Sequence, residues 1–442
     1  MKLALDQLDL ARGIETFMKG MPATSVYAAC RGVASIGVKE NEGVGITEDL
    51  MDARSLFLTP NTTTPYVFSC LNLTVGPMVI EVPPDVLGPV DDAYFRWVTD
   101  VGFTGPDKGQ GGKYLFLPPG YTGDVPADGY HIVKSPTNRL LMFYRAFVKD
   151  GNLKAAVDGV KAKARLYPLS AAANPPPTVF VNTSGQQFNT ISGNTFEFYN
   201  ELDAVVQNEP EVFVGPETVG LFAAVGIRKG QPFAPDERMT KILTEAVALG
   251  NAAARSFLWA PRDKRVFIYD DRQWLNPFVG GSYLFMSGAE LMLDVRSTFF
   301  YYATGITPAM ADAKPGTGSA YAGAFRDSKG NYLDGSKTYK VTLPGPIPAN
   351  NFWSFTVYDN QTRSLLETNQ KSAGVDSLSK DLKLNADGSA TIWFSPEAPQ
   401  GEEGNWVQTL PGKGFNSLLR LYGPLEPWFN KTWKPGDFQL VE

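Results

Sequence analysis

Alternating hydrophobic and polar residues dominate two long stretches of the chain, 59–150 and 319–442. In each stretch, short alternating or apolar runs are separated by turns built from Pro, Gly, Asn and Asp. A period of two residues is typical of strands that bury one face, and frequent turns join such strands into antiparallel sheets. Both stretches are therefore predicted to fold as jelly-roll-like antiparallel β-sandwich domains.

The residues before and between these stretches follow a helical period instead. A helix is predicted at the N-terminus and a second one at 23–37. Further helices are predicted near 151–165, 195–208 and 235–259, the last beginning at a Pro-Asp-Glu sequence that favours a helix start. The fold class is mainly β with a helical insert. Its predicted parts are a helical lead (1–58), a first β domain (59–150), a helical insert and connector (151–318) and a second β domain (319–442).

The charge and hydropathy of the chain argue against two classes of partner. The formal net charge is −6, and no cluster of Lys and Arg is interleaved with aromatic residues, whereas a nucleic-acid surface needs a basic face. No run of about 18 apolar residues occurs, so no membrane-spanning helix is predicted. The first residues carry acids too early for the apolar part of a signal peptide. The protein is therefore expected to be cytoplasmic, or to have lost a signal peptide before this sequence begins.

Two cysteines and one histidine limit the chemistry further. Cys30 and Cys70 cannot build a disulfide framework, and both are predicted to be small buried hydrophobic residues. A single histidine, His131, excludes a His-rich zinc site and a two-histidine iron site. It lies in a strand-like run and is predicted to be dispensable. A hydrolytic mechanism would use carboxylates, and any metal ion would be a hard cation such as Ca²⁺ or Mg²⁺ with oxygen ligands.

Arginines on two strand-like aromatic runs are the first candidate site residues. Arg96 and Arg145 would each be costly to bury without an anionic partner. Two explanations are open. One is an internal ion pair, for example with Asp100 or Glu81, and the other is a polar pocket that recognises an acidic or hydroxylated substrate.

A loop and a strand end supply the other candidates. The loop between Pro60 and Pro65 is rich in Asn and Thr, which either bind a ligand or satisfy their own turn. The strand at 351–358 is predicted to be mainly scaffold, and its exit is predicted to form the wall of a site. The predicted catalytic residues are Asp100 and Asp359, and the predicted binding residues are Asn61, Thr63, Thr64, Tyr66, Arg96, Arg145, Trp353, Tyr358 and Arg363.

Several separated motifs resemble a two-domain family found in bacteria and fungi. They are similar to two linked domains of unknown function, numbered 1254 and 1214, over roughly 35–150 and 320–440. The resemblance implies two jelly-roll domains comparable to double jelly-roll viral capsid proteins, a periplasmic or secreted setting, and a homo-oligomer. The motifs are "TPNTTTPYVFSCLNL", "YFRWVTDVG", Leu333-Asp334-Gly335, Phe352-Trp353-Ser354, Tyr358-Asp359, Asp387-Gly388, Asn405-Trp406, Leu419-Arg420-Leu421-Tyr422 and Trp433.

Two functions from different classes are open. The first is a hydrolase of a small ester, phosphate or glycoside, which the resemblance also implies and which a hard metal ion could assist. The alternative is a non-catalytic oligomeric protein that binds a small molecule or a glycan, or that forms a shell. In either case, the candidate residues are expected to come within reach of one another, within or between subunits.

Overall fold

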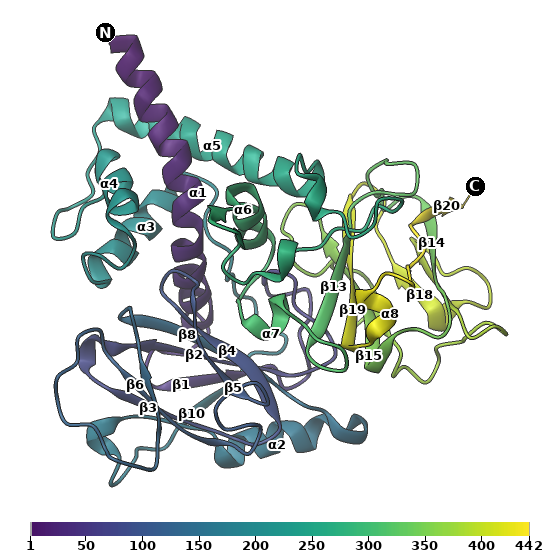
Figure 1. Cartoon of the computed structure of the whole chain (residues 1–442), viewed down its shortest axis with the longest axis horizontal. Coiled ribbons are helices and arrows are strands. Elements are labelled where there is room, and N and C mark those ends of the chain that lie inside the picture. Colours follow the sequence, from purple (N-terminus) through teal and green to yellow (C-terminus); the bar gives the residue numbers. More distant parts are fainter. Residues whose placement is uncertain (1, 442) are drawn as a thin grey trace. The chain divides into compact units, whose positions relative to one another are not determined.

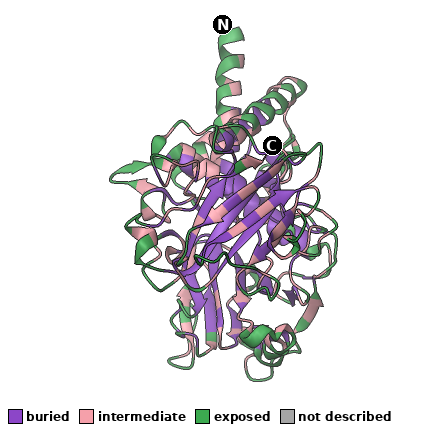
Figure 2. Cartoon of the chain, turned by 90° about the vertical axis from the view of Figure 1, so that its right-hand side faces the viewer, coloured by how far each residue is buried: buried purple, intermediate pink, exposed green. Residues whose placement is uncertain are grey.

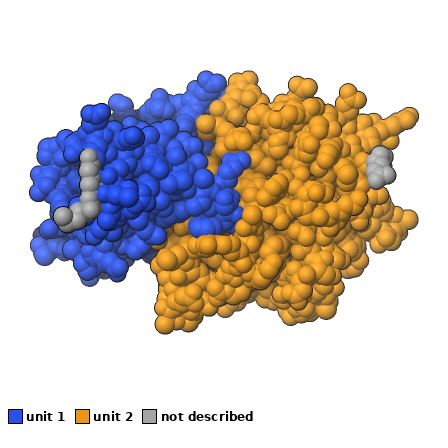
Figure 3. Space-filling view, turned by 90° about the horizontal axis from the view of Figure 1, so that it is seen from above, with its two compact units in different colours: residues 1–50, 64–258, 303–307 blue, residues 51–63, 259–302, 308–442 orange. Residues whose placement is uncertain are grey.

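The computed structural model describes residues 2–441 and divides into two units (Figures 1 and 3). The first unit holds the residues up to 50 together with 64–258 and 303–307, and the second holds 51–63, 259–302 and the residues from 308 onwards. The chain thus passes from one unit to the other five times. Two short segments, 51–63 and 303–307, belong to the opposite unit from the residues on both sides of them.

The first unit is built around a β-sandwich. One sheet has the strand order β10-β1-β2-β8-β4-β5 and the other has the order β7-β6-β3-β9. Apolar side chains from both sheets, such as Val67, Met142 and Phe116, form one core. The strands are β1 (Gly43–Ile46), β2 (Tyr66–Asn72), β3 (Met78–Val82), β4 (Val86–Asp92), β5 (Trp97–Gly102), β6 (Gly112–Leu117), β7 (His131–Lys134), β8 (Arg139–Ala146), β9 (Arg165–Pro168) and β10 (Val179–Asn182).

Helices complete the first unit. The long helix α1 packs on α5, where a Cβ added to Gly13 would lie only 2.7 Å from the Cβ of Ala246. Glycine therefore permits the close approach of the two helices. Arg238 on α5 also forms ion pairs with Asp6 and Asp9 on α1. The helices are α1 (Lys2–Ala34), α2 (Leu153–Lys163), α3 (Glu197–Asn208), α4 (Pro216–Ala224) and α5 (Glu237–Trp259).

The second unit contains another β-sandwich. Its sheets have the orders β13-β19-β15-β16 and β18-β17-β14-β20, and residues such as Trp274, Phe355 and Phe394 fill the core. The strands are β11 (Met286–Ser287), β12 (Glu290–Leu291), β13 (Ser319–Ala324), β14 (Thr338–Leu343), β15 (Ala349–Asp359), β16 (Gly374–Asp376), β17 (Ala390–Ser395), β18 (Trp406–Gln408), β19 (Phe415–Pro424) and β20 (Gln439–Val441). The helices are α6 (Leu293–Tyr302), α7 (Pro308–Ala311) and α8 (Glu426–Phe429).

The predicted fold class is confirmed, because both units contain sheets in which antiparallel pairs predominate and a helical segment lies between them in the sequence. The helices predicted near 151–165, 195–208 and 235–259 are α2, α3 and α5. Figure 2 shows strands that are largely buried, while exposed positions gather on loops and on helices. Within residues 2–441, no helix combines the length and the apolar character that crossing a membrane requires.

Two sequence expectations need correction. The two helices predicted in the first 37 residues form one continuous helix, α1, although it contains Pro22. Cys30 and Cys70 are buried as expected, but they form a disulfide that links α1 to β2. Two cysteines separated by 40 positions do not form a spacing pattern from which a disulfide can be predicted. Only the fold shows that their side chains are bonded.

Candidate functional site

One sheet of the second unit carries polar residues on the face that points away from the core. In β15, Trp353, Phe355 and Val357 fill the core, so the residues between them lie on the opposite face. The same alternation in β19 directs Leu419 and Leu421 into the core. We call the opposite side the polar face; its residues are Tyr321, Ser354, Thr356, Tyr358, Asn416, Arg420 and Tyr422.

Arg420 occupies the centre of the polar face and is only 4% exposed. In the sheet register it lies opposite both Tyr321 and Ser354. Its guanidinium donates hydrogen bonds to the Thr356 Oγ1 (3.0 Å), the Thr59 carbonyl (2.8 Å) and the Tyr358 hydroxyl (2.8 Å). Because a guanidinium presents several donors in a fixed plane, these contacts fix its orientation.

The segment 51–63 and helix α6 supply further partners for this face. The Tyr358 hydroxyl donates to the Pro60 carbonyl (2.7 Å). The Tyr302 hydroxyl donates to Asn416 Oδ1 (2.5 Å), and Asn416 Nδ2 donates to Asn360 Oδ1 (2.9 Å). Burial raises the pKa of Tyr302 well above its ordinary value, so this phenol stays neutral and acts as a donor.

Two hydroxyls on the polar face have no hydrogen-bond partner within residues 2–441. They are the Oγ of Ser354 and the phenol oxygen of Tyr422, and both side chains are buried. Ser354 lies directly opposite Arg420, and Tyr422 follows Arg420 by two positions on the same side of β19. Buried polar groups in folded proteins are nearly always paired, so these hydroxyls call for a partner that a ligand or a water molecule would supply.

The predicted exit of the strand at 351–358 is a rigid, charged turn. Burial raises the pKa of Asp359, but hydrogen bonds from Lys413 and from the amides of Gln361 and Thr362 outweigh it and bring the pKa below its ordinary value. Asp359 is therefore ionised and is held by Lys413. This arrangement suits a structural carboxylate better than a general acid.

Arg363, another predicted binding residue, follows in the same turn. Its guanidinium lies 3.9 Å from the centre of the Tyr301 ring, in cation–π contact. Its backbone is left-handed (φ 63°), as is that of Thr59 (φ 44°), and the Thr59 amide donates to the Arg363 carbonyl (3.2 Å). Such strain in non-glycine residues persists only where the surroundings enforce it, and it is often found at functional sites.

Three other predicted site residues of the second unit, Trp353, Asn61 and Thr63, have structural roles. Trp353 lies in the core and not on the polar face, because it falls on the opposite side of β15. The Asn61 side chain accepts hydrogen bonds from both the amide (3.0 Å) and the hydroxyl (3.2 Å) of Thr63. Asn61 and Thr63 thus satisfy their own turn, which was one of the two explanations that the sequence left open, whereas the Thr62 hydroxyl accepts a hydrogen bond from the Ser372 hydroxyl outside the loop (3.0 Å).

The remaining predicted residues belong to the first unit. Tyr66 and Arg145 are opposite each other on β2 and β8, and Thr64 is buried just before β2. Arg96 forms an ion pair with Asp92 (2.6 Å) and not with Asp100 or Glu81. The internal ion pair that the sequence allowed for Arg96 is therefore present, with a different acid.

Asp100 belongs to a group of three buried carboxyl groups with Asp91 and Asp92. Burial raises the pKa of all three, and for Asp91 the neighbouring carboxylates raise it further. Asp91 Oδ2 accepts a hydrogen bond from the Ile306 amide (2.9 Å), and Asp100 Oδ2 accepts one from the Thr307 hydroxyl (2.9 Å). Asp91 and Asp100 thus bind residues of the segment 303–307, which belongs to the first unit.

Replacing Asp91 with asparagine is expected to change the pH dependence of stability. The folded state binds the Asp91 proton more tightly than the unfolded chain does, because burial raises the pKa of Asp91. The contribution of the protonated Asp91 to the free energy of unfolding is therefore fully present below a pH of about 4, and it is lost as the pH rises through the raised pKa. Asparagine does not titrate and keeps an acceptor for the Ile306 amide. Urea unfolding from about pH 4 to about pH 8 should show Asp91→Asn gaining stability relative to the wild type as pH rises. A difference that stays constant over this range would contradict the assignment.

The structure therefore divides the predicted site residues between the two units. Asn61, Thr63, Trp353, Tyr358, Asp359 and Arg363 belong to the second unit, and Thr64, Tyr66, Arg96, Asp100 and Arg145 belong to the first. Within residues 2–441, no group of three His, Cys, Asp or Glu side chains is placed to hold a metal ion. The polar face adds six residues that sequence reasoning missed: Tyr321, Ser354, Thr356, Asn416, Arg420 and Tyr422. An arginine inside the apolar run "LLRLYGP" was the available signal.

A comparison with one solved structure agrees with this architecture. The crystal structure of the VPA0106 protein from Vibrio parahaemolyticus matches with a TM-score of 0.60 and 18% identity, covering 98% of this chain and 100% of that chain. This likeness shows the fold alone. A putative uncharacterized protein from Burkholderia cenocepacia matches with a TM-score of 0.44 and 12% identity, covering 100% of this chain and 96% of that one. No curated protein matches the chain.

Two family models match the two β-rich parts of the sequence. A "protein of unknown function" model, DUF1254, matches residues 43–168, which include most strands of the first unit. A second such model, DUF1214, matches residues 318–426, which include β15, β19 and the whole polar face. The motifs that carried the resemblance in the sequence lie within or close to these two matches. The chain therefore belongs to the family of proteins of unknown function that join a DUF1254 domain to a DUF1214 domain.

Proposed function

We propose that the polar face of the second unit binds a small organic anion, such as a carboxylate. The observation that carries this proposal is the pair of buried hydroxyls without partners, on Ser354 and Tyr422, beside the guanidinium of Arg420. Guanidinium and hydroxyl groups together are well suited to binding carboxylate or phosphate oxygens, because the guanidinium supplies positive charge and the hydroxyls supply directional hydrogen bonds. The proposed function is thus the small-molecule binding that the sequence left open as the non-catalytic alternative.

The test uses two variants that remove only a hydroxyl, Tyr422→Phe and Ser354→Ala. Deleting a buried hydroxyl that has no partner in the ligand-free protein should leave the free energy of unfolding unchanged or raise it. The same deletions should weaken ligand binding by about tenfold each, since a hydrogen bond to a charged group contributes about 1.5 kcal/mol. Calorimetric titration with small mono-, di- and tricarboxylates and inorganic phosphate measures binding, and urea unfolding measures stability.

The matched controls are hydroxyls of the same unit that do have partners. The Tyr269 hydroxyl donates to the Trp433 carbonyl (3.2 Å), and Ser417 Oγ donates to the Thr356 carbonyl (3.1 Å). Tyr269→Phe and Ser417→Ala should lower the free energy of unfolding by about 1 kcal/mol and leave ligand binding unchanged. If Tyr422→Phe destabilises the protein as much as Tyr269→Phe does, the Tyr422 hydroxyl is structural and the proposal fails.

Hydrolysis of a small ester, phosphate or glycoside is the second candidate function. It is supported by the pKa of Asp100, which burial raises above its ordinary value, because a raised pKa brings a carboxyl group closer to the range in which it can act as a general acid. The other predicted catalytic residue, Asp359, belongs to the second unit, where its ion pair with Lys413 keeps it ionised. Asp100 and Asp359 are therefore not proposed as a catalytic pair. A screen of chromogenic esters, phosphates and glycosides with the wild type and with Asp100→Asn tests this candidate, with and without Ca²⁺ or Mg²⁺.

A periplasmic or secreted setting forms part of the proposal. The disulfide between Cys30 and Cys70 supports it, because disulfides persist in oxidising compartments and are rare in the reducing cytosol. Assembly into a homo-oligomer stays a prediction from the family resemblance.

A further inference from the structure

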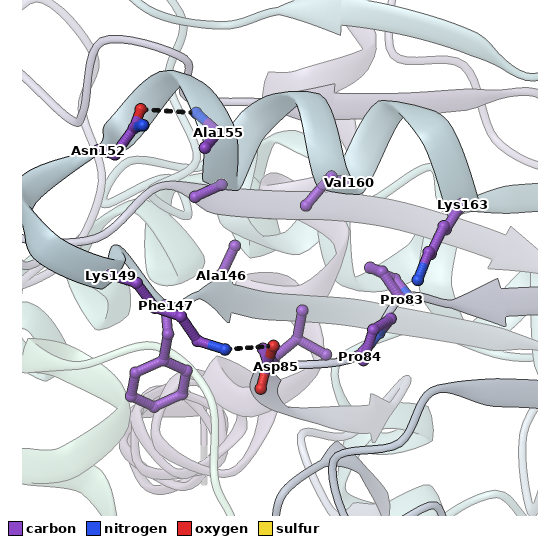
Figure 4. A pocket seen from close by; sticks show the side chains of 13 residues that line it. Pro83, Pro84, Asp85, Ala146, Phe147, Lys149, Asn152, Ala155, Val160 and Lys163 are labelled. Atoms are coloured by element: carbon purple, nitrogen blue, oxygen red, sulfur yellow. Dashed lines mark hydrogen bonds and ion pairs between the residues drawn. The ribbon is translucent and has the colours of Figure 1, made fainter.

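The first unit contains a pocket that is independent of the polar face. It lies between helix α2 and the turn that leads into β4, and its volume is about 200 Å³ (Figure 4). The buried side chains of Pro83, Val86, Ala146 and Val160 contribute to its lining. The pocket therefore presents an apolar surface with limited freedom to rearrange, because prolines at 83 and 84 fix the adjoining turn.

Small residues of helix α2 create the space. Ala155, Ala156 and Gly159 lie along the side of the helix that lines the pocket, where larger side chains would fill it. A Cβ built on Gly159 would meet no atom within 4 Å, so the pocket has open volume at this position. Glycine is not required there by backbone conformation, since its φ lies outside the left-handed region.

The charged groups of the pocket leave one lysine without an internal partner. Lys149 forms an ion pair with Asp85 (2.7 Å), and Figure 4 shows these two side chains pointing toward each other. Lys163, from the last turn of α2, lines the pocket and makes no hydrogen bond or ion pair with the chain over residues 2–441. The lining charges thus sum to one positive charge, carried by Lys163.

We propose that this pocket binds a small monocarboxylate with an apolar body, about the size of benzoate. Its volume exceeds the cavity of about 150 Å³ that accepts benzene in an engineered protein, so an aromatic ring with one carboxylate fits. The apolar lining takes the ring, and the ammonium of Lys163 pairs with the carboxylate. Because the pocket is open to solvent, the ion pair adds selectivity for an acid more than it adds affinity.

The decisive variant is Gly159→Leu, which fills the pocket without opening a cavity elsewhere. Leucine is a better helix former than glycine, so the variant should be at least as stable as the wild type. It should weaken the binding of benzoate at least about tenfold, as measured by protein NMR titration or calorimetry. The matched control is Gly220→Leu in α4, another helical glycine whose Cβ would meet no atom within 4 Å and which does not line this pocket.

A second pair of measurements tests the charge. Lys163→Gln should weaken benzoate binding about two- to fivefold and leave the binding of neutral benzamide unchanged. The expected order for the wild type is benzoate and cyclohexanecarboxylate ahead of benzamide, with acetate weakest because it lacks the apolar body. The proposal is overturned if Gly159→Leu binds benzoate as well as Gly220→Leu does, if benzamide equals benzoate, or if none of these acids binds the wild type.

Discussion

Removal of the Cys30–Cys70 disulfide should lower the free energy of unfolding of the first unit by about 4 kcal/mol. The bond closes a loop of 40 positions between α1 and β2, and the loop-closure entropy of an unfolded chain of that length gives this figure. The double variant Cys30→Ala, Cys70→Ala removes the link without leaving a reactive thiol. Urea unfolding followed by circular dichroism measures the change.

The wild type under reducing conditions provides the control for this result. Reduced wild type and oxidised double variant should unfold at similar urea concentrations, while the oxidised wild type should unfold at a clearly higher one. Adding a reductant to the double variant should have no effect. If the oxidised wild type and the double variant unfold together, the two cysteines do not form a bond that stabilises the fold.

Replacing Arg420 with methionine should lower the free energy of unfolding by about 3 kcal/mol. Methionine keeps an unbranched apolar stem, so packing changes little, but every hydrogen bond that the guanidinium donates is lost. A buried acceptor left without its donor costs about 1 to 3 kcal/mol. The acceptors affected include the Thr59 carbonyl, Thr356 Oγ1 and the Tyr358 hydroxyl, together with the more distant Pro60 carbonyl (3.5 Å). Binding of small organic anions should be lost as well.

Arg265→Met is the matched control, since it makes the same change in the same unit. Arg265 forms an ion pair with Asp263, and about half of its side chain is exposed (49%). The urea midpoint of this variant should stay close to that of the wild type, because exposed ion pairs contribute little. Equal stability of Arg420→Met and Arg265→Met would contradict the central place assigned to Arg420.

Local patterns in the sequence predicted the elements well where one face of each element is buried. The alternation in 351–358 predicted a strand that is mainly scaffold, and the Pro-Asp-Glu sequence at 235–237 predicted the start of α5. The expected break in the first helix did not occur. Pro22 lies inside α1 and did not end it, so the contacts of this helix outweigh the local preference of one residue.

The candidate site was harder to predict because its parts come from distant positions. Arg96 was predicted to need a partner, and its acid, Asp92, lies only four positions away. Arg420 is more deeply buried and needs partners more, but its partner Thr59 is 361 positions away. No local pattern links such residues, and the unpaired state of Ser354 and Tyr422 is visible only once the strands have a register.

The segment 51–63 makes the order of protein synthesis matter for folding. The Pro60 carbonyl receives its hydrogen bond from Tyr358, which is 298 positions later in the chain. At about 5 to 20 residues per second, a ribosome needs roughly 15 to 60 seconds to make that interval. During this time the strands that the segment contacts have not yet been synthesised. The second unit can therefore form only after nearly the whole chain has emerged from the ribosome. A gene fragment cut to residues 318–426 would encode β15 and β19 but omit the backbone that holds Tyr358 and Arg420 in place.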